Sequence, residues 1–276
     1  MSLETRPIPR TGEAIPVVGL GTWQAFDVPG DGPERAAAKE ALRALAEGGG
    51  KMVDSSPMYG AAEEAVGALS AELGIGGRLF VATKVWTSGR EAGIRQMEAS
   101  LRKLRVERLD LMQVHNLVDT DTHLATLRAW QKEGRVRYLG VAHYHAGAHG
   151  AVEAAIRKHR PEFVQLNYSL AEREAEQGLL EVARDEGVAV IVNRPFAEGA
   201  MFARVKGRPL PDWAREIDCE SWAQVFLKFI VSHPAVTCAI PGTRNPKHVA
   251  DNLGAARGRL PDAALRRRMA AHYDGL

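Results

Sequence analysis

The chain repeats one pattern eight times, a short apolar run followed by a longer stretch of helical periodicity. The apolar runs are VVGLGT, KMVDSS, LFVATKV, LDLMQVH, YLGVAHY, FVQLNYS, VAVIVNRPF and VTCAIPGT. Such alternation is typical of parallel strands joined by crossover helices. The eight units fill 276 residues without a break in composition. The sequence therefore predicts one α/β domain over residues 1–276, a closed (β/α)8 TIM barrel.

Two further features refine this prediction. An open doubly wound sheet alternates in the same way, but a glycine fingerprint usually follows its first strand, and GLGTW has only two of those glycines. The segment RPIPRTGEAIPVV predicts an N-terminal β-hairpin that covers one end of the barrel, and PDAALRRRMAAHYDGL predicts a short C-terminal helix. Residues 197–220 lack clear periodicity, as in a lid or binding loop.

Composition excludes several classes of protein. The net charge of +2 is spread along the helices, which argues against binding to nucleic acid, and no apolar run is long enough to span a membrane. Cys219 and Cys238 do not suggest a disulfide framework, and MSLETRPIPR lacks a signal-peptide core, so we expect a cytoplasmic protein, a monomer or weak oligomer. His143, His145 and His149 lack the further ligands of a metal site, and none is expected.

The ends of consecutive strands are polar, and barrel enzymes carry their reactive residues there. The residues at these ends are Asp54, with Tyr59 just beyond it, Lys84 and His115. A neighbouring ammonium lowers the pKa of a phenol, so we expect Lys84 to make Tyr59 a better proton donor, with Asp54 as counterion. His115 can bind a substrate oxygen. Each residue alone is more often structural, but their convergence favours a site that protonates a carbonyl oxygen.

With these residues the sequence resembles the aldo-keto reductases. The shared motifs are VVGLGTW, the segment 54–60 that pairs Asp54 with Tyr59, ATKVW, LDLMQVHN and IPGTRNPKHVADNL, in family order over nearly the whole chain. The resemblance implies reduction of a small-molecule carbonyl. It implies that Tyr59 is the general acid, that Lys84 tunes it and pairs with Asp54, and that His115 orients the carbonyl.

No side chain can supply hydride, so the reaction needs a cofactor, and the resemblance implies a nicotinamide. Gly242 and Thr243 precede a helix start and can offer backbone N–H groups to a phosphate. Arg244 can form a bidentate contact with the 2′-phosphate that distinguishes NADPH from NADH. NADPH is therefore expected, and NADH stays an open alternative.

The phosphate side departs from the family pattern at three positions. Gly242 and Thr243 stand where relatives carry Lys and Ser, and His248 stands where they carry Arg. Arg244 is expected to compensate for the lost cations. Asp251 and Asn252 match the acidic residue and Asn that hold adenosine in relatives.

The nicotinamide side departs as well. Ala142 and His143 replace a Ser-Asn pair, and Asn193 aligns with the Tyr that usually stacks on the ring. His143 is expected to replace the missing Asn as a donor, and Phe196 or Arg194 to take over the ring contact. The other residues expected to contact the cofactor are Thr22, Trp23, Asp54, Gln165 and Pro195.

Apolar residues next to the motifs predict an open substrate cleft for a small aldehyde or ketone. Its expected walls are Trp23, Phe26, Met58, Trp86 and Leu117. Asn116 replaces the Trp that often follows the family's catalytic His, which widens the mouth.

Two other functions compete with carbonyl reduction. The chain could be a regulatory or redox-sensing subunit that holds NADPH with little turnover, which the intact set of four residues opposes. A Schiff-base enzyme that uses Lys84 would need a neutral amine, which the neighbouring Asp54 opposes.

Overall fold

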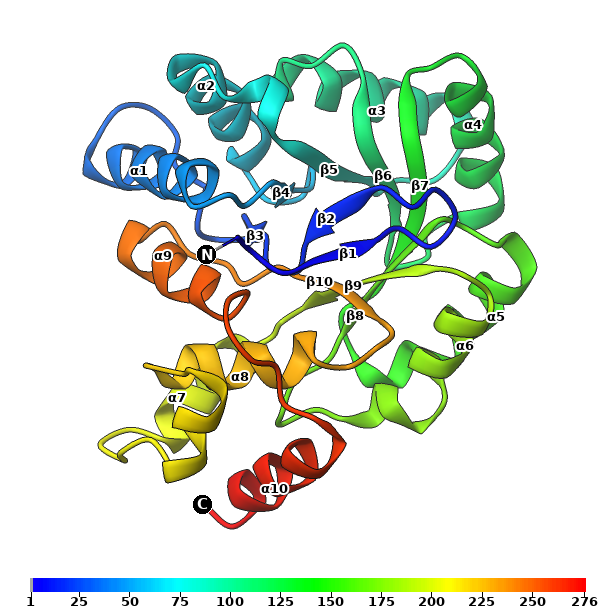
Figure 1. Cartoon of the computed structure of the whole chain (residues 1–276). Helices are drawn as coiled ribbons and strands as arrows, with labels where there is room; N and C mark the ends of the chain where they lie inside the picture. The colour runs from blue at the N-terminus through cyan, green and yellow to red at the C-terminus, as the bar shows by residue number, and fades with distance from the viewer. Residues whose placement is uncertain (1) are drawn as a thin grey trace.

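The computed structural model describes residues 2–276 and contains an eight-stranded parallel barrel surrounded by helices (Figure 1). The strands are β3 (Leu20–Gly21), β4 (Met52–Asp54), β5 (Phe80–Val85), β6 (Leu109–His115), β7 (Val136–Ala142), β8 (Phe163–Asn167), β9 (Ala189–Asn193) and β10 (Val236–Ala239). Each strand pairs with its sequence neighbour, and bridges from Val18 to Ala239 and from Gly21 to Gly242 join the first strand to the last. The predicted (β/α)8 barrel is confirmed.

The helices pack their apolar faces on the barrel. They are α1 (Pro33–Glu47), α2 (Ala62–Leu73), α3 (Arg90–Leu104), α4 (Thr120–Lys132), α5 (His149–His159), α6 (Leu179–Asp185), α8 (Trp222–Val231) and α9 (Pro246–Gly254), followed by the predicted C-terminal helix α10 (Ala263–Asp274). In α1, Ala38, Leu42 and Leu45 recur at helical spacing and are fully buried. In Figure 1, α1 lies beside α9, so the two ends of the barrel sequence meet.

The connection over residues 197–220 is more ordered than the sequence suggests. It contains η4 (Ala197–Gly199), α7 (Ala200–Arg204) and η5 (Asp212–Ile217). Phe202 of α7 packs against Phe196 and Phe226, with ring centroids 4.8 and 5.7 Å away. These turns are too short to produce a helical pattern in the sequence, and a role of this connection as a lid or binding loop stays a prediction. The other single turns are η1 (Gly76–Arg78), η2 (Ala146–Ala148) and η3 (Glu174–Gln177).

The N-terminal hairpin covers one end of the barrel, as predicted. Strands β1 (Thr5–Pro7) and β2 (Ala14–Pro16) are antiparallel and lie across that end in Figure 1. Ile8 and Ile15 are fully buried in the same apolar cluster as Phe80 and Phe163 of the barrel interior. This end is sealed by apolar contacts, so the opposite end is left for chemistry.

Two absences concern only residues 2–276. No helix there is long and apolar enough to cross a membrane. No group of three or more His, Cys, Asp or Glu there is placed to hold a metal ion. Cys219 and Cys238 are both buried and unpaired with each other.

Candidate active site

A buried ion pair stands at the centre of the open end. Lys84 Nζ donates to Asp54 Oδ2 over 2.6 Å and to the carbonyl oxygen of Ser55 over 2.8 Å. Burial alone would favour the neutral amine, but the neighbouring carboxylate of Asp54, followed by a contribution from Tyr59, outweighs it, so the pKa of Lys84 is raised. The raised pKa favours the ammonium form of Lys84 and opposes the Schiff-base alternative, which needs a neutral amine.

Two amides hold the other oxygen of the same carboxylate. Gln113 Nε2 and Gln165 Nε2 each donate to Asp54 Oδ1 over 3.0 Å. Gln113 is not among the residues predicted from the sequence. Strand periodicity could have found it, because it lies two residues before His115 and so faces the same side of β6. Gly140 makes room for it, since a Cβ at Gly140 would lie 3.0 Å from Cγ of Gln113.

Tyr59 lies against this ion pair. Lys84 Nζ is 5.1 Å from the centroid of the Tyr59 ring, and the residue is only partly buried. Burial raises the pKa of Tyr59, Lys84 opposes that rise and Asp54 adds to it, and the net pKa is raised. The expectation of a net lowered pKa was wrong, because sequence does not report how strongly the fold desolvates the phenol. The ammonium limits the rise, and Tyr59 stays protonated at neutral pH.

His115 lies next to Tyr59, and the two rings are nearly perpendicular. The two ring centroids are 6.0 Å apart at an interplanar angle of 88°. His115 Nδ1 lies 3.0 Å from Ser56 Oγ, a partner that the sequence analysis missed. Burial, and then the charges of Lys84 and His143, lower the pKa of His115 to about 3, so the imidazole is neutral.

Exposed apolar side chains surround this group. Trp23, Met58 and Trp86 are 47%, 40% and 43% exposed, and each follows a barrel strand, while their place in a substrate cleft stays a prediction. Trp86 also lies near His115, with centroids 6.5 Å apart. Phe26 is fully buried in the core, so its expected place in the cleft was wrong.

The turn after β6 completes the rim. Asn116 and Leu117 both have positive φ, +53° and +57°, where residues other than glycine are uncommon. The backbone N–H of Asn116 donates to the carbonyl oxygen of Ala142, which fixes this turn against β7. Leu117 is only partly buried and packs on the core.

The expected nicotinamide side offers a matched donor and acceptor. Asn193 Nδ2 donates to the carbonyl oxygen of His143 over 2.9 Å and to Gln165 Oε1 over 3.3 Å, while its Oδ1 is buried without a partner. Nδ1 of His143 accepts from the N–H of Tyr144, which leaves Nε2 to carry the ring proton. Asn193 Oδ1 is thus an acceptor and His143 Nε2 a donor, and a primary carboxamide, the group that nicotinamide carries, pairs with both kinds of group.

The loop after β9 is held by protein contacts. Arg194, at φ +49°, donates to the carbonyl oxygen of Tyr144 over 3.3 Å and lies 3.6 Å from Glu198. Pro195 is buried, and the ring of Phe196 packs on Phe202. A contact from Arg194 or Phe196 to the cofactor ring stays a prediction.

Residues at the start of α9 form the expected phosphate side. Asn245 caps the helix by accepting from the N–H of Lys247, and Thr243 Oγ1 accepts from the N–H of Asn245. His248 Nδ1 lies 3.5 Å from Thr243 Oγ1. Arg244 is not free, because its Nη2 donates to Glu34 Oε1 of α1 over 2.6 Å.

Three other expected cofactor residues are either bonded to other side chains or the backbone, or buried. Asp251 accepts from Ser221 Oγ over 2.8 Å and from Gln224 Nε2 over 2.7 Å. Asn252 is 5% exposed. Thr22 is fully buried and donates to the carbonyl oxygen of Asp54 over 3.0 Å. These contacts hold the site's framework, and their contribution to cofactor binding stays a prediction.

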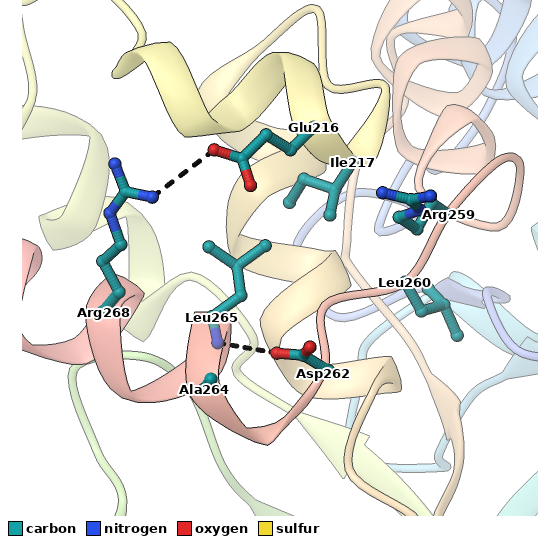
Figure 2. A pocket seen from close by; sticks show the side chains of 8 residues that line it. All are labelled: Glu216, Ile217, Arg259, Leu260, Asp262, Ala264, Leu265 and Arg268. Atoms are coloured by element: carbon teal, nitrogen blue, oxygen red, sulfur yellow. Dashed lines mark hydrogen bonds and ion pairs between the residues drawn. The ribbon is translucent and has the colours of Figure 1, made fainter.

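A separate surface cavity lies away from this group. It has a volume of about 500 Å³ between η5 and α10 (Figure 2). None of the predicted site residues lines it. Its charged walls include Glu216 and Arg268, which form a surface ion pair at 3.4 Å. The convergence of ionisable groups therefore places the candidate site at the barrel mouth and not in this cavity.

Comparison with known proteins agrees with this geometry. Residues 17–271 match the model of the aldo/keto reductase family. The chain belongs to the aldo/keto reductase family. As a member of it, the chain is an oxidoreductase, and the regulatory alternative is not favoured.

Relatives of this reductase share most of its length. It is 28% identical over 260 residues to methylglyoxal reductase YeaE of Escherichia coli (strain K12), which covers 91% of this chain and 89% of that protein. It is 30% identical over 259 residues to an aldo-keto reductase of Mycobacterium sp. (strain KMS), and the match covers 88% of this chain and 84% of that protein. An aldo/keto reductase of Klebsiella pneumoniae, solved in complex with NADP and acetate, has the same fold, with a TM-score of 0.82 and 24% sequence identity. The match covers 98% of this chain and 96% of that chain.

Proposed function

We propose that this reductase converts a small aldehyde or ketone to the alcohol with NADPH, and that Tyr59 Oη donates the proton. The position of Tyr59 between the ammonium of Lys84 and the neutral imidazole of His115 carries this proposal. When bound, the nicotinamide supplies the hydride that goes to the carbonyl carbon. The residues of the chain then have to orient the carbonyl oxygen and neutralise the charge that develops on it.

Tyr59 and Lys84 carry out the proton step. A phenol whose pKa is raised is protonated at neutral pH, which is the form a general acid needs. As the hydroxyl proton moves to the substrate oxygen, negative charge appears on Tyr59 Oη. The ammonium of Lys84 stabilises that charge more than the neutral phenol, so its effect is greatest in the transition state. Asp54, fixed by two amides, keeps the ammonium in place.

His115 is proposed to orient the carbonyl. The hydroxyl of Ser56 can donate to Nδ1, because Ser56 Oγ itself accepts from the N–H of Met58 over 3.4 Å. The ring proton then lies on Nε2, which can donate to the carbonyl oxygen. A neutral donor beside Lys84 avoids placing a second cation in the buried site.

The cofactor is proposed to lie across the mouth from β9 to the start of α9. Asn193 Oδ1 and His143 Nε2 would hold the carboxamide, and Arg244 with the N–H groups near Thr243 would hold the 2′-phosphate. The Klebsiella pneumoniae relative was solved with NADP, which supports this choice of cofactor. The other proposed contacts are those expected from the sequence: Thr22, Trp23, Asp54, Gln165, Arg194, Pro195, Phe196, Gly242, His248, Asp251 and Asn252.

The substrate is proposed to be small and weakly polar. Trp23, Met58 and Trp86 give the cleft apolar walls, and Asn116 leaves it open. The Escherichia coli relative is named a methylglyoxal reductase, so methylglyoxal and a benzaldehyde are suitable probes. A monomer or weak oligomer in the cytoplasm, with residues 1–276 folding as one unit, completes the proposal. Light scattering, cell fractionation and a single unfolding transition test these points.

Tyr59→Phe is the decisive experiment. It keeps the ring but removes the proton, so turnover should fall by about 10²–10⁴-fold while NADPH affinity stays within about twofold. Tyr138→Phe is the matched control, because the Tyr138 hydroxyl bonds to Glu13 near the sealed end and not to the site. Steady-state oxidation of NADPH measures turnover, and cofactor fluorescence measures binding. Wild-type turnover by Tyr59→Phe would refute the assignment.

A further inference from the structure

One ion pair connects the first turn of α1 to the loop between β10 and α9, which carries the proposed phosphate side. Glu34 lies in the first turn of α1, and Arg244 follows β10, 210 positions later in the chain. Glu34 Oε1 and Arg244 Nη2 are 2.6 Å apart, and the two side chains are 62% and 39% exposed. Within residues 2–276 neither has another ion-pair partner. The adjacent Arg35 pairs instead with Glu72 and Asp31.

The pair sets two anions in competition for one arginine. The guanidinium fork of Arg244 matches a 2′-phosphate, but the carboxylate of Glu34 already accepts from one of its N–H groups. The other cations expected from the family pattern are replaced by Gly242 and His248. Recognition of the phosphate therefore depends mainly on Arg244, so whatever holds Arg244 affects the choice of cofactor.

We propose that Glu34 is a specificity-determining residue that competes with the 2′-phosphate for Arg244. It narrows the preference for NADPH over NADH. Binding of NADPH has to break the Glu34–Arg244 contact, whereas binding of NADH leaves it intact. This inference rests on the proposed function, because it requires that the 2′-phosphate bind at Arg244.

Glu34→Gln tests the inference by equilibrium binding. Its dissociation constant for NADPH should fall by about two- to fivefold, the range that measured exposed ion pairs span, and its constant for NADH should not change. Titration of cofactor fluorescence measures both constants on the same protein. Equal constants for wild type and Glu34→Gln with both cofactors would overturn the inference.

Arg244→Gln separates this inference from the proposed function. Loss of NADPH preference in Arg244→Gln, together with unchanged constants in Glu34→Gln, would leave the phosphate site standing and reject only the role of Glu34. An unchanged preference in Arg244→Gln would reject the phosphate site itself. In the double variant the effect of Glu34→Gln should vanish, because no guanidinium is left to compete for. A full effect retained there would show direct repulsion and contradict competition.

Glu216→Gln is the matched control. Glu216 pairs with Arg268 on the wall of the separate cavity, with side chains 56% and 57% exposed (Figure 2). It removes the same charge from a similar surface pair that lies outside the site. In Glu216→Gln the ratio of the dissociation constants for NADPH and NADH should stay at the wild-type value. A shift as large as that in Glu34→Gln would show that the effect of Glu34→Gln comes from net charge, which would overturn the inference.

Discussion

The barrel interior has two layers built by the same strands, and their chemistry is opposite. The layer toward the hairpin is apolar, and the layer at the open mouth is charged and hydrogen-bonded. Residues two apart on one strand share a face, so Met52 lies below Asp54, Leu111 below Gln113, and Phe163 below Gln165. Two positions along a strand thus separate the residues that stabilise the fold from the residues of the candidate site.

The two layers also differ in how they are stabilised. Apolar side chains contribute through burial and close packing, and each can be exchanged for one of similar volume. The polar layer costs free energy of desolvation, which only its own partners offset. Asp54 illustrates this, since both of its oxygens have donors. Changes in the polar layer at the mouth, called the upper layer here, should therefore alter both activity and stability, and changes in the apolar layer toward the hairpin, the lower layer, should alter stability alone.

Lys84→Met should have the largest effect, because it affects both properties. Turnover should fall by about 10²–10⁴-fold as Tyr59 loses its cation. The free energy of unfolding should fall by about 3–5 kcal/mol, since Asp54 is left buried without a counterion. Steady-state kinetics and urea denaturation measure the two losses. Adding Asp54→Leu should recover much of the stability and none of the turnover, and recovery of turnover would contradict the role of the ion pair.

Phe163→Ala should damage only the lower layer. Phe163 is fully buried, and its ring lies 5.5 Å from that of Tyr138 and 6.0 Å from that of Phe80. Loss of this ring should lower the free energy of unfolding by about 3–5 kcal/mol. Turnover per folded molecule should stay within about threefold of wild type, measured below the unfolding transition. A loss of turnover like that of Lys84→Met would show that the layers are not independent.

The buried imidazole of His115 predicts a dependence of stability on pH. Its pKa is about 3 in the folded protein, against about 6.5 when unfolded. Between these two pH values the unfolded chain binds more protons than the folded protein. The stability that the neutral imidazole contributes is therefore fully present above pH 6.5 and is lost as the pH falls toward 3. From pH 7.5 to pH 5 the loss is about 2 kcal/mol. Urea denaturation at both pH values should show a smaller loss for His115→Gln, and an equal loss would reject this pKa.

Most of the barrel and the residues at its mouth could be predicted from sequence, because both depend on local patterns. The strand of Lys84 is a continuous apolar run, and a charged residue at its end stands out. Ser56 and Gln113 were missed because a polar residue within or beside a strand has many uses, and their partners come from other strands. The direction in which the pKa of Tyr59 shifts depends on how deeply the phenol is buried, and this follows only from the assembled fold.

The contact between Glu34 and Arg244 could not be predicted from the sequence. The motif around Arg244 is local and predicted a cation for a phosphate. Its partner is in α1, and only barrel closure brings α1 and the start of α9 together. A single sequence gives no signal for a pair of surface charges so far apart. Local motifs thus identify the chemistry of the site, and the fold identifies what competes for it.

Gln113→Met should have the smallest effect. It tests how much the amides, as compared with the ammonium of Lys84, stabilise the charge of Asp54. Methionine keeps the volume that Gly140 leaves open but donates nothing to Asp54. Gln165 still donates to Asp54 Oδ1, so the free energy of unfolding should fall by only about 1 kcal/mol and turnover by less than about fivefold. Urea denaturation and steady-state kinetics measure both. If Gln113→Met were as damaging as Lys84→Met, the charge on Asp54 would depend on the amides as much as on the ammonium, and Gln113 would belong with the residues essential to the proton step.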